Sequence, residues 1–226
     1  MYPAPSVIFF TVFSGIGFGL LFFLGLGYPF VTGWVAFAFF TIAYLCAVGG
    51  LISSTFHLGH PERALKAFTQ WRSSWLSREG WCAVIALILM AIYGAGLVVL
   101  GTRWWLIGVA GAVFSALTVF TTSMIYTQLK TIPRWNSPLT PVMFMSFSLA
   151  GGALLAGQVT WAIGLLGVAA AVQIVRWRVR ARTWPQPPGW APAAPCARSS
   201  RRIPAPITCS RNSPTPSAAS TASNCA

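Results

Sequence analysis

Long apolar runs fill most of the first 175 residues of this 226-residue chain, and only 8% of all residues are charged. A helix needs about 20 residues to cross the hydrocarbon of a bilayer. Four runs have that length. The 35-residue stretch 141–175 is too long for one crossing, and Gly157, Gln158 and Thr160 divide it into two. The sequence therefore predicts an all-α, polytopic transmembrane helix bundle of about six spans. The spans are expected at Val7–Gly27, Trp34–Phe56, Gly80–Leu100, Trp104–Tyr126, Pro141–Ala156 and Thr160–Val175.

The placement of the basic residues indicates a membrane topology. The net charge of +13 by itself would also suit a nucleic-acid-binding protein. With six spans, however, fourteen of the fifteen Lys and Arg residues lie on the N-terminal side of the membrane, and only Arg103 lies on the other. Cytoplasmic loops are enriched in Lys and Arg. We therefore expect a cytoplasmic N-terminus, a lipid membrane and no nucleic acid as partner, and a first helix that is retained after the uncharged start MYPAPS.

The last part of the chain has a different composition. From about Thr183 it is rich in Pro, Ser, Ala and Arg, without hydrophobic periodicity. Such a segment cannot bury enough apolar surface to fold. We expect a transmembrane domain at 1–182 and a disordered tail at 183–226. The abrupt change suggests translation in a shifted reading frame, or truncation, after about residue 182.

Ionisable groups suited to proton transfer are concentrated in one segment. Both acidic residues and both histidines of the chain lie between His57 and Glu79. Titratable groups are costly inside hydrocarbon and usually have a function or lie at the interface. His57 is expected at the C-terminal end of the second span, and Glu79 in the first turn of the third, with Ser77 as its N-cap. Helix capping alone would explain each residue. Together they could exchange protons with a hydroquinone.

The other polar residues of this segment have simpler interpretations. His60 and Glu62 are expected in a solvated loop, whereas Arg63, Trp75 and Arg78 are candidates for the periphery of the site. Haem normally takes axial ligands from opposite sides of the ring, which His57 and His60, three residues apart, are poorly placed to supply. The five cysteines form no C-x-x-C pair, which argues against an iron–sulfur cluster. We therefore expect neither haem nor an iron–sulfur cluster in this chain, and no metal site.

Several motifs resemble those of one family. The strings STFHLGHPERA, SSWLSRE, YTQLKTIPRWNSPLTP and SLAGGALLAG, within Pro5–Arg182, are similar to the membrane anchor subunit of bacterial dimethyl sulfoxide reductase. The resemblance implies an eight-helix protein of the bacterial cytoplasmic (inner) membrane that serves anaerobic electron transport. Its partners would be a molybdopterin catalytic subunit and an iron–sulfur subunit, and its substrate menaquinol. It implicates His57 and Glu79 in quinol binding.

Two other function classes compete with a quinol-oxidising anchor that has no complete active site of its own. A small membrane transporter would place polar groups near the bilayer midplane on interrupted helices, yet the first four predicted spans carry no charge at depth. The Gly15/Gly17/Gly19 and Gly151/Gly152 faces are more typical of close helix packing. A purely structural tether would bind partners without any effect of quinone.

Overall fold

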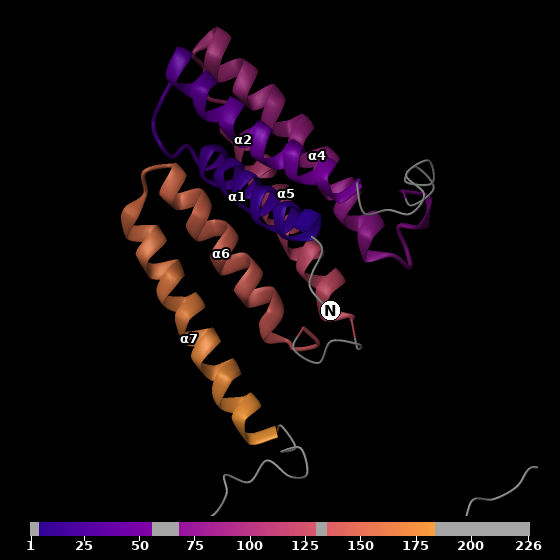
Figure 1. Cartoon of the computed structure of the whole chain (residues 1–226). Coiled ribbons are helices and arrows are strands. Elements are labelled where there is room, and N and C mark those ends of the chain that lie inside the picture. The colour runs from indigo at the N-terminus through magenta and orange to yellow at the C-terminus, as the bar shows by residue number, and fades with distance from the viewer. Residues whose placement is uncertain (1–4, 56–67, 130–134, 184–226) are drawn as a thin grey trace, which may run out of the picture. The chain divides into compact units, whose positions relative to one another are not determined.

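The computed structural model describes residues 5–55, 68–129 and 135–183, and within these ranges every regular element is helical (Figure 1). The long helices are α1 (Pro5–Gly25), α2 (Gly33–Thr55), α4 (Trp75–Ala95), α5 (Trp105–Thr127), α6 (Leu139–Leu155) and α7 (Val159–Thr183). A short 3₁₀ turn, η2 (Phe68–Gln70), precedes α4, and a π-helical turn, η3 (Gly96–Leu100), follows it. The predicted all-α class is confirmed. The predicted boundary at 182/183 stays a prediction, because residues 184–226 lie outside the described part.

Five helical segments are long and apolar enough to cross a membrane. They are Val7–Gly25, Gly33–Ser54, Trp75–Leu100, Trp105–Thr127 and Val159–Arg178. The remaining predicted span corresponds to α6, which is apolar but has only 17 residues. At 1.5 Å per residue its length is about 25 Å, which is close to the lower limit for a crossing.

Two helices extend beyond the limits of the apolar runs. The third predicted span begins at Trp75 instead of Gly80, and the last continues to Thr183 instead of Val175. Backbone hydrogen bonding does not require apolar side chains, and Arg, Ala and Leu all favour helix. Both extensions therefore carry polar and basic residues beyond the apolar part of each helix.

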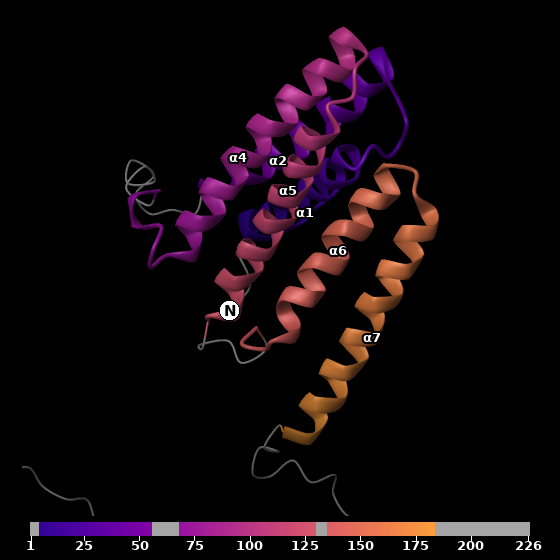
Figure 2. The same cartoon turned by 180° about the vertical axis from the view of Figure 1, so that it is seen from behind.

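Consecutive helices run in opposite directions, as Figures 1 and 2 show from two sides. The connections 26–32, 101–104 and 156–158 lie at one end of the bundle. The C-terminal ends of α2, α5 and α7 lie at the other, together with the start of α4. Arg72, Arg78, Arg176 and Arg178 belong to this second end, whereas Arg103 belongs to the first.

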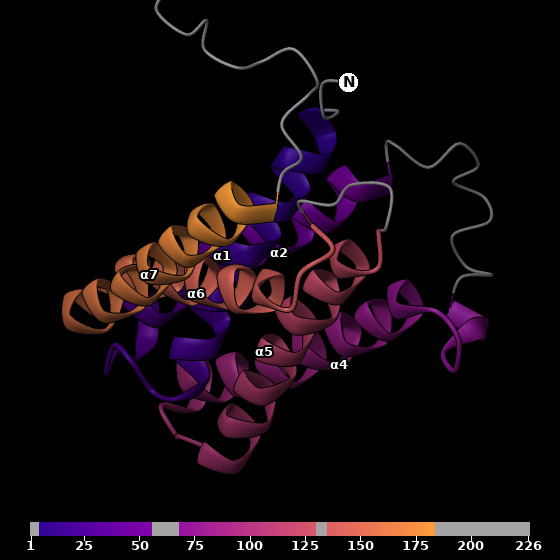
Figure 3. The same cartoon turned by 90° about the horizontal axis from the view of Figure 1, so that it is seen from below.

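Helix α1 packs against α2, α5 and α6, and α7 packs on α6 at the edge of the bundle (Figure 3). Glycines allow these close approaches. A Cβ added at Gly17 would overlap the backbone of Ala47 on α2, and one added at Gly19 would overlap the backbone of Ser148 on α6. At the C-terminal end of α1, Gly25 lies directly against Gly108 of α5. Small residues at membrane helix interfaces permit such contact, which confirms the packing interpretation of the α1 glycines.

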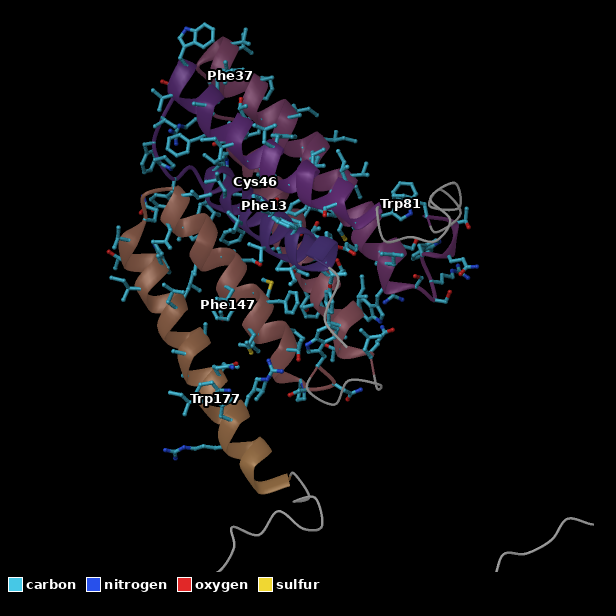
Figure 4. The ribbon with its side chains drawn as sticks, in the orientation of Figure 1. Phe13, Phe37, Cys46, Trp81, Phe147 and Trp177 are labelled. Carbon is cyan, nitrogen blue, oxygen red and sulfur yellow. The ribbon has the colours of Figure 1, made fainter. Side chains whose placement is uncertain are left out.

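Large apolar side chains cover the outside of the bundle as well as its interior. Phe18, Leu20 and Leu21 of α1 are fully buried. Phe37, Phe147 and Trp177, on three different helices, are about half or more exposed (Figure 4). A water-soluble monomer rarely exposes so much contiguous apolar surface. The outer surface therefore fits a lipid environment.

Candidate functional site

Glu79 lies more than one turn inside α4, because the helix begins earlier than its apolar run. The N-cap is Ser74, with extended backbone angles (φ −110°, ψ 123°), and no acidic residue is in the first turn. The prediction that Ser77 caps this helix, with Glu79 in the first turn, is therefore wrong. The first turn begins at Trp75 and includes Ser77, whose buried hydroxyl donates to the carbonyl of Phe68 (3.1 Å).

The Glu79 carboxyl is buried between α4 and α5. The residue is only 3% exposed, and Thr122 Oγ1 of α5 donates to its Oε1 at 2.6 Å. Of the described titratable side chains, Cys82 of α4 and Tyr126 of α5 interact electrostatically with it. A carboxyl removed from water is costly unless it has hydrogen-bond partners. Glu79 is thus a buried polar group inside an apolar helix pair, and the helix dipole at the first turn does not explain its position.

Close packing of α4 against α5 fixes the position of Glu79. Five of the seven buried residues of α4 recur every three or four positions, at Glu79, Ala83, Ala86, Met90 and Tyr93. On α5, a Cβ at Gly111 would overlap Met90, and one at Gly108 would lie 3.0 Å from the Tyr93 ring. Two alanines on one helix and two glycines on the other bring the backbones together. The carboxyl can therefore reach a side chain as short as threonine.

The η2 turn covers the start of α4. The Phe68 carbonyl accepts hydrogen bonds from Ser77 Oγ and from Trp81 Nε1, both at 3.1 Å. The Phe68 and Trp81 rings pack edge to face with centroids 5.9 Å apart. Gly80 makes room for this contact, because a Cβ there would lie 2.7 Å from the Phe68 ring. The η2 turn is thus fixed by hydrogen bonds and ring packing to the part of α4 that carries Glu79.

Arg78 is held by the loop before α4. Its Nε donates to the carbonyl of Trp71 (3.0 Å) and its Nη2 to that of Arg72 (2.8 Å). The guanidinium also lies 4.5 Å from the centre of the Trp75 ring. The structure therefore brings together two predicted peripheral residues, Trp75 and Arg78, and directs the Arg78 side chain toward the loop.

Comparison with known proteins identifies the family. The sequence profile described as "DMSO reductase anchor subunit (DmsC)" matches residues 1–176. The chain belongs to the family of dimethyl sulfoxide reductase anchor subunits. Together with the apolar helices, this membership makes it a multi-pass membrane protein.

The chain is similar to the C subunits of two different oxidoreductases. The C subunit of the sulfite dehydrogenase of Allochromatium vinosum is 32% identical over 216 residues, which cover 80% of this chain and 66% of the relative. The C polypeptide of the anaerobic dimethyl sulfoxide reductase of Escherichia coli K12 is 30% identical over 143 residues, which cover 56% of this chain and 47% of the relative. The chain thus spans about two thirds of the length of the first relative and about half of the length of the second. No solved structure matches it.

The remaining predicted site residues of the anchor subunit lie outside the described residues. His57 and Arg63 fall within 56–67, as do His60 and Glu62. Helix α2 is described as far as Thr55, two residues before His57. The structure thus places Glu79, Trp75 and Arg78 and leaves the position of His57 as predicted from the sequence.

Sequence reasoning missed Thr122, the hydrogen-bond partner of Glu79. The available signal was the hydroxyl-rich end of α5, TTSMIYT, in an otherwise apolar span. That signal is weak, because hydroxyls in apolar helices usually donate to their own backbone. Within residues 5–55, 68–129 and 135–183, no three His, Cys, Asp or Glu side chains are grouped so that they could hold a metal ion. Cys46 and Cys82 are free thiols.

Proposed function

We propose that this anchor subunit binds and oxidises menaquinol at a site that includes His57 and Glu79. Electrons pass from there to an iron–sulfur partner subunit, and then to a molybdopterin catalytic subunit, in anaerobic respiration. The observation that carries the proposal is the buried Glu79 carboxyl, 3% exposed inside a helix long enough to span the membrane. Ionisable residues in such a position are expensive to bury and generally functional.

The chemistry requires proton acceptors close to the quinol hydroxyls. Oxidation of one quinol releases two electrons and two protons. The electrons go to the partner's cluster, and each proton goes to a base within hydrogen-bond reach of a hydroxyl. A carboxylate at Glu79 and a neutral imidazole at His57 are both suitable acceptors. Arg63, Trp75 and Arg78 belong to the periphery of the site in this proposal.

The charge distribution supports an orientation of the chain. The end of the bundle with Arg72, Arg78, Arg176 and Arg178 is the basic end, and Arg103 is at the opposite end. By the positive-inside rule, the basic end and the N-terminus face the cytoplasm of the inner membrane. Glu79 lies near the same end, so protons from the quinol leave on that side.

Contacts of the buried hydroxyls give the transporter alternative little support. Ser115, Thr118 and Thr121 of α5 donate to carbonyl oxygens of their own helix at 2.8–2.9 Å. Their hydroxyl hydrogens are therefore already paired within α5. The activity of site variants distinguishes a purely structural tether from a quinol-oxidising anchor.

The test uses the assembled complex in membranes. His57→Ala and Glu79→Gln should each abolish electron transfer from a menaquinol analogue to the catalytic subunit. A water-soluble donor that reduces the partner subunits directly serves as the control, and its activity should be unchanged. Full quinol-dependent activity in both variants would favour the structural tether and refute the site.

A further inference from the structure

We propose that Thr122 is a positioning residue that holds the Glu79 carboxyl in both of its protonation states. The inference rests on the proposed function, since Glu79 must take up and release a proton there. Thr122 lies on α5, outside every motif that the sequence singled out. Its hydroxyl is the hydrogen-bond partner of the Glu79 carboxyl in the described part of the chain.

The geometry gives the Thr122 hydroxyl two possible acceptors. Its Oγ1 lies 2.6 Å from Glu79 Oε1 and 2.8 Å from the carbonyl oxygen of Thr118, one turn earlier on α5. A hydroxyl has one hydrogen to donate and two lone pairs that can accept. It can therefore donate to only one of these two oxygens at a time.

Each protonation state of Glu79 selects one arrangement. When Glu79 is a carboxylate, Thr122 donates to Oε1. When Glu79 carries the proton, the carboxyl O–H donates to Thr122 Oγ1, and the hydroxyl hydrogen turns to the Thr118 carbonyl. All heavy atoms keep their positions. The buried carboxyl is thus satisfied before and after proton transfer, without the penalty of an unpaired polar group.

Neighbouring hydroxyls on α5 lack this property. Thr121 Oγ1 lies 2.9 Å from each of two possible acceptors, the carbonyl oxygens of Leu117 and Thr118, and Ser123 donates to the carbonyl of Phe120 at 2.6 Å. These bonds stay within one helix and involve no titratable group. The cross-helix contact to Glu79 therefore distinguishes Thr122 from residues of the same chemistry and burial.

The surroundings of the pair add no charged partner from the residues whose contacts are described. Among the described titratable groups, Cys82 of α4 and Tyr126 of α5 interact electrostatically with Glu79. Arg78, the adjacent cation, is bound by the carbonyls of Trp71 and Arg72. Among the described side chains, the Thr122 hydroxyl is therefore the group that orients the carboxyl.

The test compares three variants in the assembled complex. Thr122→Val keeps the shape of the side chain and removes the hydroxyl, Thr122→Ser keeps the hydroxyl, and Thr121→Val is the matched control. Loss of one hydrogen bond to an ionisable group should lower the rate of menaquinol oxidation about tenfold. We expect this decrease in kcat, with little change in KM, for Thr122→Val only. Activity with the direct donor measures the amount of assembled complex and corrects for poor folding.

Infrared spectroscopy reports on the carboxyl independently of turnover. The C=O band of protonated Glu79 is assigned by its absence from Glu79→Gln, and its frequency depends on hydrogen bonding. It should shift in Thr122→Val and keep the parent frequency in Thr122→Ser and Thr121→Val. An unshifted band, or a parent rate per assembled complex in Thr122→Val, would overturn the positioning role. Parent activity in Glu79→Gln would instead overturn the quinol site, and the band would still test the hydrogen bond.

Discussion

Arg78 and Glu79 are adjacent in the sequence and have opposite environments on α4. The Arg78 side chain turns back to the loop, where two carbonyls and the Trp75 ring hold its guanidinium. Glu79 is buried against α5 and accepts a hydrogen bond from Thr122. The two opposite charges therefore do not neutralise each other. Consequently, the carboxyl can change its protonation state without breaking an ion pair with Arg78.

Arg78 should stabilise the loop before α4 more than it affects Glu79. Arg78→Ala removes two hydrogen bonds to carbonyls and a cation–π contact, which together are worth about 1–3 kcal/mol of local stability. Hydrogen exchange of the backbone amides in 68–78 should become faster, while the Glu79 carboxyl band stays unchanged. Arg78→Lys keeps the charge but not the forked geometry, so it should give partial protection. A shifted carboxyl band in Arg78→Ala would show that the arginine acts on Glu79.

Gly80 should be required for docking of Phe68 on α4. In Gly80→Ala the new Cβ would lie 2.7 Å from the Phe68 ring, so the η2 turn must move. We expect a loss of about 1–3 kcal/mol, typical of overpacking, and altered Trp81 fluorescence. The control is the double variant Phe68→Ala/Gly80→Ala. If the clash is the cause, Gly80→Ala should have almost no further effect in the Phe68→Ala background.

The sequence predicts the helices better than the contacts of the site. Apolar runs locate the membrane segments because lipid demands them. They fail at the start of α4, since the turn with Trp75, Ser77 and Arg78 is helical without being uniformly apolar. The pairing of Glu79 with Thr122 depends on how α4 and α5 pack. Any hydroxyl of TTSMIYT could bond its own helix, and only tertiary contact selects Thr122 for the carboxyl.

Gly19 should be essential for packing of α1 on α6. An added Cβ would overlap the backbone of Ser148, which cannot rotate away as a side chain can. Gly19→Ala should lower the free energy of unfolding in detergent by about 1–3 kcal/mol. Gly164→Ala on α7 is the matched control, because its Cβ would meet nothing within 4 Å. It should be neutral or stabilising by up to about 1 kcal/mol. Equal stability of the two variants would contradict the proposed α1–α6 contact.

Glu79 should be needed for menaquinol oxidation but should not stabilise the folded subunit. In Glu79→Leu the buried carboxyl is replaced by an apolar side chain, and the Thr122 hydroxyl can still donate to the Thr118 carbonyl at 2.8 Å. None of the described polar groups that contact Glu79 is then left unpaired, so replacement by an apolar residue should be neutral or stabilising. Thermal unfolding of the purified subunit in detergent should show a midpoint equal to or above that of the parent, while menaquinol oxidation by the complex is lost. Glu79→Ala is the comparison variant, because it leaves a cavity and should unfold earlier. A strongly lowered midpoint in Glu79→Leu would mean that the carboxyl is retained to hold α4 and α5 together.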